Sequence, residues 1–140
     1  MSTERNGSII LLVDDSDDDR FLFVIAFRKS RVRGQVVEKE DGNEAIEFLN
    51  QIATGSRAEW PSAVFLDLKM PTRDGFEVLQ WVSERPVFKS LPIFVLSGSH
   101  EPSDIRRASE LGAAQYVVKP VTAERIRELL HPLCPETDTV

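Results

Sequence analysis

The chain has 140 residues, of which 41% are hydrophobic and 29% charged, and its formal net charge is −6. This composition is ordinary for one globular domain, and the acidic balance excludes the basic footprint of a nucleic-acid-binding domain, so we expect no DNA binding. A single cysteine cannot form an internal disulfide, and no apolar run approaches the ~20 residues of a membrane-spanning helix. We therefore expect a cytoplasmic protein without a membrane segment.

Five short apolar runs alternate with five helical patterns along the chain. Apolar runs without polar alternation are typical of strands buried on both faces of a parallel sheet. The predicted strands lie at 8–13, around 36–37, at 63–67, 93–96 and 116–119, and the predicted helices at 17–30, 43–52, 76–85, 101–111 and 123–130. This alternation predicts an α/β fold, namely a flavodoxin-like, doubly wound parallel sheet of five strands in the order 2-1-3-4-5, flanked by five helices.

The first predicted helix begins with three aspartates, Asp17, Asp18 and Asp19, which we expect to cap the helix or to face solvent. It continues as an unbroken apolar run from Phe21 to Phe27. We expect about half of this run to pack on the sheet and the remainder to lie exposed, where a helical partner domain could dock.

Four of the predicted strands end in residues that can handle a phosphoryl group. The first strand leads into Asp14 and Asp15, the third ends at Asp67, the fourth at Ser97 and the fifth at Lys119. In open parallel sheets, binding sites lie outside the carboxyl ends of the strands. The sequence therefore predicts one acidic pocket that holds a hydroxyl and an amine.

These residue types suit phosphoryl transfer. Crowded carboxylates repel one another, so such a cluster indicates a bound cation, and oxygen ligands are those that Mg²⁺ prefers. Asp67 is the candidate nucleophile, because a carboxylate can accept a phosphoryl group when a metal neutralises the charge. Ser97 would donate a hydrogen bond to a phosphoryl oxygen, and Lys119 would pair with another. Pro120 is a candidate for a cis peptide bond that fixes the loop behind Lys119.

With these residues the chain strongly resembles the receiver domain of bacterial two-component response regulators, over residues 8–130. The matching residues are Asp14, Asp15, Asp67-Leu68-Lys69-Met70-Pro71, Asp74-Gly75, Ser97, Tyr116 and Lys119-Pro120. The resemblance implies that Asp67 is the phospho-acceptor, that Asp15 binds Mg²⁺ directly and that Asp14 acts on the metal mainly through water. It also implies that the backbone carbonyl of Lys69 is a metal ligand and that Lys119 binds the phosphate. Ser97 and Tyr116 match the family's switch pair, and no organic cofactor is implied.

The resemblance divides the chain into an N-terminal tail at 1–7, a receiver domain at 8–132 and a C-terminal tail at 133–140. The stretches 12–16 and 92–97 and the long connection around Trp60 resemble single-domain regulators that work with bacterial phytochromes and similar hybrid sensor kinases. Two positions depart from the family pattern. Gly98 stands where many receivers carry alanine, and Lys69 lies two residues beyond Asp67, where side chains influence the lifetime of the acyl phosphate.

The function that we expect is a phosphorylation-controlled switch. A sensor histidine kinase or phosphotransfer protein would donate the phosphoryl group to Asp67 with Mg²⁺ bound, and the chain would catalyse only its own phosphorylation and dephosphorylation. Phosphorylation would then change a partner-binding surface formed by the fourth helix, fifth strand and fifth helix. The sequence does not name the downstream target. We expect a homodimer through the same surface, with Phe94, Tyr116 and the polar tail close to it.

Three other functions remain open. Asp15-Ser16-Asp17 follows a strand, as the nucleophile motif of haloacid-dehalogenase-like phosphatases does, which would make Asp15 the nucleophile. A receiver that serves only as a binding scaffold is the second. A flavin-binding module of the same fold order is the third, although no Ser/Thr/Gly-rich phosphate loop follows the first strand.

Overall fold

The computed structural model describes residues 8–55, 60–70 and 73–134. The predicted tail at 1–7, most of the predicted tail at 133–140, part of the connection before Trp60 and Pro71 of the Asp67 motif lie outside the described residues. The elements are β1 (Ser8–Val13), α1 (Asp17–Ser30), β2 (Gly34–Lys39), α2 (Gly42–Thr54), β3 (Ala63–Asp67), α3 (Gly75–Ser83), the 3₁₀ helix η2 (Pro86–Phe88), β4 (Ile93–Ser97), α4 (Pro102–Glu110), β5 (Gln115–Val118) and α5 (Ala123–Leu130). Within the described part of the chain, no helix combines the length and the apolar character needed to cross a membrane.

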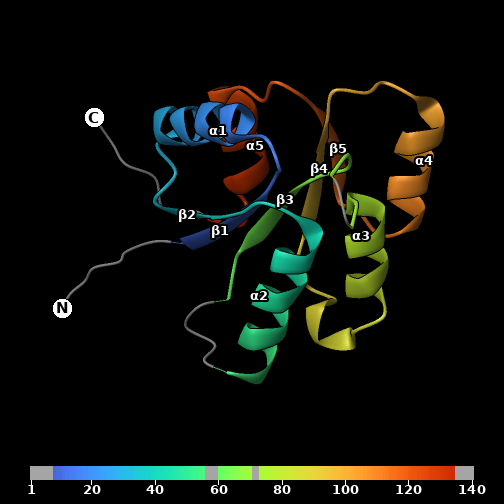
Figure 1. Cartoon of the computed structure of the whole chain (residues 1–140). Helices are drawn as coiled ribbons and strands as arrows, with labels where there is room; N and C mark the ends of the chain where they lie inside the picture. The colour runs from blue at the N-terminus through green and yellow to red at the C-terminus, as the bar shows by residue number, and fades with distance from the viewer. Residues whose placement is uncertain (1–7, 56–59, 71–72, 135–140) are drawn as a thin grey trace.

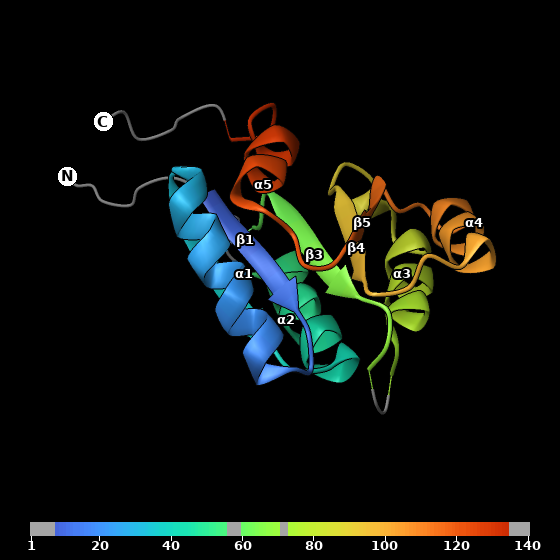
Figure 2. The same ribbon diagram turned by 90° about the horizontal axis from the view of Figure 1, so that it is seen from above.

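All five strands are parallel and lie in the order β2-β1-β3-β4-β5, which confirms the predicted fold. Helices α1 and α5 cover one face of the sheet, while α2, α3 and α4 cover the other (Figure 1). Seen from above, β1 and β3 run side by side between the two helix layers, and their arrowheads point toward the same edge (Figure 2). The carboxyl ends of the strands therefore meet at one edge, as the right-handed crossovers of such folds require.

Polar side chains define where the helices begin. Ser16 caps α1, Asp41 caps α2 and Thr122 caps α5, each by accepting a hydrogen bond from a backbone N–H in the first turn. At α3, Asp74 and Glu77 form a reciprocal capping box. These caps agree with the predicted helix starts to within one residue.

The two faces of the sheet carry separate hydrophobic cores. On the α1/α5 side, the ring centroids of Phe23 and Phe94 lie 4.9 Å and 5.1 Å from that of Phe65. Phe94 is 4% exposed in this core, so its side chain does not itself reach the surface where we expect a dimer face. A strand alternates its side chains between the two layers, and position 94 points toward α1 and α5. On the other face, Trp60 packs against the buried ring of Phe88 in η2, an element that the sequence did not predict.

Gly75 brings the start of α3 onto the end of β3. Its N–H donates a hydrogen bond to the backbone carbonyl of Leu68 at 3.0 Å. A Cβ atom at this position would lie 2.4 Å from the carbonyl oxygen of Asp67 and 2.8 Å from Cα of Leu68. Only glycine allows so close a backbone approach, and this approach fixes the loop directly beside Asp67.

Candidate functional site

Three carboxylates meet where β1 and β3 end. β1 leads directly into Asp14 and Asp15, and Asp67 is the last residue of β3. Carboxylate oxygens of the three residues all lie within 4.8 Å of one another, with Asp14 and Asp67 only 1% and 4% exposed. Oxygen ligands at this spacing fit a divalent cation, because an ion of opposite sign offsets their mutual repulsion. The structure thus brings together all three aspartates that the sequence placed in one pocket.

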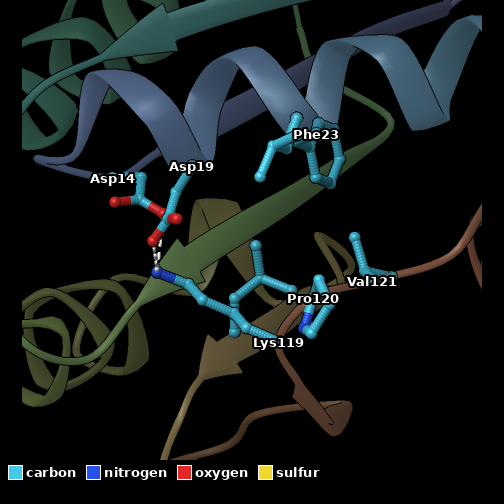
Figure 3. A pocket seen from close by; sticks show the side chains of 8 residues that line it. Asp14, Asp19, Phe23, Lys119, Pro120 and Val121 are labelled. Carbon is cyan, nitrogen blue, oxygen red and sulfur yellow. Dashed lines mark hydrogen bonds and ion pairs between the residues drawn. The ribbon is translucent and has the colours of Figure 1, made fainter.

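The Lys119 amine lies among these carboxylates. Its Nζ is 2.8 Å from Oδ2 of Asp14, 2.7 Å from Oδ2 of Asp19 and 3.5 Å from Oδ2 of Asp67. Figure 3 shows the lysine side chain reaching from the end of β5 toward Asp14 and Asp19. The peptide bond between Lys119 and Pro120 is cis, as the sequence suggested. The amine therefore lies within reach of any group held on Asp67.

Asp19 differs from its sequence interpretation as a cap or a solvated residue. The helix cap is Ser16, whose Oγ accepts the backbone N–H of Asp19 at 3.1 Å. The Asp19 carboxylate is free of that task and instead binds Lys119, which lies 100 residues away along the chain. The neighbouring Asp18 is exposed and makes no ion pair with a described residue, in agreement with a solvated role.

The surroundings of Asp67 change its pKa. Burial raises the pKa of Asp67, Lys119 lowers it and the Asp14 charge raises it again, with a net value of about 6. The N–H of Lys69 donates to Oδ1 of Asp67 at 3.3 Å and also favours the ionised form. Burial alone would lower the pKa of Lys119, but hydrogen bonds to Asp14 and Asp19 outweigh that effect and raise it. At neutral pH the site therefore holds an ionised nucleophile candidate beside a protonated amine.

Arg20 fixes the backbone of the loop between β1 and α1, which carries Asp14 and Asp15. This buried guanidinium donates from Nη1 to the carbonyl oxygen of Asp14 at 2.6 Å and from Nε to Oε1 of Glu38 at 3.2 Å, and it also pairs with Asp17. The N–H of Ser16 donates to Oδ1 of Asp14 at 3.0 Å. Arg20 therefore joins α1, the β1–α1 loop and β2, and places a fixed positive charge behind the aspartates.

A hydrogen-bonded chain leads from the site toward α4. Ser97 is fully buried, and its Oγ accepts the N–H of Ser99 at 3.1 Å. The Tyr116 hydroxyl donates to the carbonyl oxygen of Ser99 at 2.9 Å, while Oγ of Ser99 donates to Oδ2 of Asp104 at 3.3 Å. Asp104 also lies 3.9 Å from Nζ of Lys69. The two sequence-predicted switch residues are thus connected through one loop residue.

A cavity of about 270 Å³ adjoins the Lys119 side of the site. Its lining has a charged part and an apolar part, which are formed by Asp14, Asp19 and Lys119 and by Leu22, Phe23, Leu96, Pro120 and Val121 (Figure 3). Leu22 and its neighbour Phe21 are 54% and 65% exposed, so part of the apolar run in α1 does face solvent beside the site. Phe23 and Phe27 of the same run are buried against the sheet, as predicted.

Sequence reasoning missed Asp19, Arg20, Ser99 and Asp104. Asp19 and Arg20 belong to a helix start whose acidic composition has an adequate local explanation, so nothing in the local pattern separates them from capping residues. Asp19 contacts Lys119 and Arg20 contacts Glu38 only because α1 packs beside β2 and beside the end of β5. Ser99 contributes a backbone carbonyl and Asp104 a carboxylate. Neither residue carries a sequence signal that distinguishes it from the other residues of its loop or helix.

Comparison with known proteins shows which protein family the chain matches. The family model for the response regulator receiver domain matches residues 10–131. The curated protein "Response regulator Rcp1" of Synechocystis sp. is 34% identical over 120 residues, which cover 85% of this chain and 82% of Rcp1.

Solved structures show the same fold. A Mn²⁺-bound crystal form of Rcp1 has a TM-score of 0.75 and 28% identity, with 95% of this chain and 98% of that chain covered. The bacteriophytochrome response regulator AtBRR has a TM-score of 0.77 and 35% identity, with coverage of 92% and 94%. The phosphorylated cyanobacterial phytochrome response regulator RcpA has a TM-score of 0.77 and 29% identity, with coverage of 94% and 100%.

Proposed function

Because this chain belongs to the response regulator receiver domain family, we propose that Asp67 accepts a phosphoryl group from a sensor histidine kinase or a phosphotransfer protein, which makes the chain a phosphorylation-controlled switch. The observation that carries this proposal is the position of Asp67, a buried carboxylate 3.5 Å from an amine and within 4.8 Å of two further carboxylates. Receivers of this family act on themselves and do not turn over a separate substrate.

In the transfer step, an Asp67 carboxylate oxygen would attack the phosphorus of a phosphohistidine. A bond from phosphorus to that oxygen forms while the bond from phosphorus to the imidazole nitrogen of the donor breaks. The Lys119 ammonium group would pair with one phosphoryl oxygen, and the Ser97 hydroxyl would donate to another. The contribution of the chain is thus positioning and charge neutralisation, as in other phosphoryl transfers.

The donor set of the site fits a divalent cation, and we propose Mg²⁺ bound by Asp15, Asp67, the backbone carbonyl of Lys69 and, mainly through water, Asp14. Such an ion supplies neutralisation of the charge that gathers on the phosphoryl oxygens. The exposure of Asp15 leaves the metal side of the cluster open to solvent, which suits an ion that retains several waters. The Lys119 amine lies on the buried side, beside Asp14.

The switch would run through Ser99. When the Ser97 side chain turns toward a phosphoryl oxygen, its Oγ moves relative to the Ser99 N–H whose hydrogen bond it accepts. Ser99 also holds the Tyr116 hydroxyl and Asp104 of α4, so a shift there changes the surface formed by α4, β5 and α5. We propose that this surface binds a partner protein or a second copy of the chain.

The relatives suggest the kind of kinase. AtBRR and RcpA are described as phytochrome response regulators, so we propose a phytochrome-class or similar hybrid sensor kinase as the phosphodonor, in the cytoplasm. The phosphatase alternative with Asp15 as nucleophile has little support, because the amine of Lys119 contacts Asp14 and Asp67 and not Asp15.

Intact-mass measurement after incubation with Mg²⁺ and acetyl phosphate tests the proposal. We expect one added phosphoryl group on the wild type, dependent on Mg²⁺ and absent from Asp67→Asn. Asp18→Asn, an exposed charge change near the site, is the matched control and should be phosphorylated like the wild type. An adduct that persists in Asp67→Asn would refute Asp67 as the acceptor. An adduct lost in Asp15→Asn but kept in Asp67→Asn would support the phosphatase-like reading.

A further inference from the structure

We propose that Asp19 is a brake on phosphorylation: its carboxylate holds the Lys119 ammonium group on the α1 side of the site, and the lysine must leave Asp19 before it can bind a phosphoryl group on Asp67. This inference deepens the proposed function and rests on it. It assigns a positioning role to a residue outside the set of aspartates that form the candidate cation site.

The geometry favours Asp19 over Asp67 as the partner of the amine. An ammonium group has three N–H donors, and in this structure two short contacts go to Asp19 at 2.7 Å and to Asp14 at 2.8 Å. The third carboxylate, Asp67, is 3.5 Å away, at the limit of a hydrogen bond. The amine is therefore held mainly by two carboxylates that do not accept the phosphoryl group.

Of these two carboxylates, Asp19 is the one that can release the amine. The Asp14 side chain is 1% exposed, and its other oxygen is held by the Ser16 N–H, so its position is fixed. The Asp19 side chain is 39% exposed on the first turn of α1, where water can solvate it after the ion pair breaks. A new phosphoryl oxygen would consequently compete with Asp19 for the lysine.

The negative charge of Asp19 also opposes phosphorylation. A phosphoryl group that arrives on Asp67 is anionic, and it approaches a site that already contains several carboxylates within reach of one amine. Each carboxylate that remains paired with Lys119 weakens the attraction of the amine for the phosphoryl oxygens. Removal of the Asp19 charge therefore leaves the lysine free for the new anion.

The side chain of Asp19 does not cap α1. The helix cap is Ser16, which uses only the backbone N–H of Asp19, and Asp17 and Asp18 keep the first turn acidic. Asp19→Asn keeps the size and shape of the side chain, so the variant should fold like the wild type. A change in its phosphorylation then reports on the ion pair and not on the helix.

The test compares wild type, Asp19→Asn and Asp18→Asn, with initial phosphorylation rates from acetyl phosphate and affinities for beryllofluoride, both with Mg²⁺. Beryllofluoride is a phosphoryl analogue, so its affinity reads the lysine contact without a transfer step. We expect Asp19→Asn to be phosphorylated about fivefold faster and to bind beryllofluoride about fivefold more tightly, as the loss of one partly exposed ion pair suggests. Asp18→Asn should stay within about 1.5-fold of the wild type, because an exposed charge is screened by salt.

The same comparison in a Lys119→Met background isolates the ion pair. Asp19→Asn should have no effect there, because the brake has lost the group that it holds. An unchanged or slower rate in Asp19→Asn, equal acceleration by Asp18→Asn, or a persistent effect without Lys119 would each overturn the inference. A wild type that gains no phosphoryl group on Asp67 would instead overturn the proposed function, and the inference with it.

Discussion

The hydroxyl of Tyr116 in β5 lies 2.9 Å from the backbone carbonyl oxygen of Ser99, so one hydrogen bond joins the edge strand of the sheet to the loop that follows β4. The two residues are 17 positions apart in the chain. The bond is partly buried, so water does not readily replace it.

Tyr116→Phe removes this hydrogen bond and keeps the ring. We expect a loss of about 1 kcal/mol in the free energy of unfolding, the usual net contribution of one such bond. Urea unfolding followed by circular dichroism measures it, and Gln115→Ala on the same strand is a control for edge-strand substitution. A Tyr116→Phe variant as stable as the wild type would show that the bond contributes nothing to the unphosphorylated state.

Alanine substitutions at Gly75 and Gly98 should have opposite effects. Gly75→Ala would place a Cβ atom 2.4 Å from the Asp67 carbonyl oxygen, whereas the same atom at Gly98 meets nothing within 4 Å. We expect Gly75→Ala to cost about 2–3 kcal/mol and to lower the phosphorylation rate, because the backbone beside Asp67 must shift. Gly98→Ala should keep full stability and lengthen the lifetime of the acyl phosphate, since the added methyl group shields the site from water.

The pKa of Asp67 makes its contribution to stability depend on pH. Its folded-state pKa of about 6 is above the ordinary 3.8, so the folded state binds the proton more tightly than the unfolded state. Stability from this group is thus present below pH 3.8 and is lost as the pH rises to about 6. We expect Asp67→Asn to be more stable than the wild type by roughly 2 kcal/mol at pH 7 and by little at pH 3.5. A difference that does not change with pH would contradict this expectation.

Asp15→Asn tests the cation site with little risk to the fold, because Asp15 is exposed. Mg²⁺ should stabilise the wild type, by ~2.7 kcal/mol at a concentration one hundred times the dissociation constant. Thermal unfolding with Mg²⁺ and with EDTA should show this increase in the wild type and in Asp18→Asn, and a much smaller one in Asp15→Asn. An equal Mg²⁺ effect in all three proteins would place the ion elsewhere.

Lys69 extends into solvent above the site, with its side chain 70% exposed and its Nζ 3.9 Å from Asp104. Its backbone N–H, which contacts Asp67, is kept in Lys69→Ala. We therefore expect this variant to change the rate of autodephosphorylation more than the rate of phosphorylation. Both rates can be followed by phosphate-affinity gel electrophoresis, and equal changes in the two would defeat the idea.

Much of the fold could be predicted because the signals are local. The apolar run from Ile9 to Val13 and the helix that starts after Ser16 each have an unambiguous period and start signal, and the structure matches their predicted bounds. The buried strand ends place Asp14, Asp67, Ser97 and Lys119 near one another by topology alone, since all the strands are parallel.

What could not be predicted depends on which side chain faces which neighbour. A run of apolar residues does not say which helix layer each one meets, and only the structure shows that Phe94 lies in the α1/α5 core. The Asp19–Lys119 pair joins residues at opposite ends of the chain, and a first-turn aspartate already has a satisfactory local role. Such pairings require the packed structure.

The carboxylates and the amine of the site are synthesised at different times. Asp14 and Asp15 directly follow β1 and Asp67 ends β3, so all three belong to the first half of the sequence, whereas Lys119 follows β5, the strand at the sheet's edge and the last to be synthesised. A ribosome-bound chain that has not yet made β5 consequently holds its crowded carboxylates without the amine. Docking of β5 thus completes the sheet and brings the amine to the carboxylates, and a chain interrupted before residue 119 would keep their mutual repulsion without this partner.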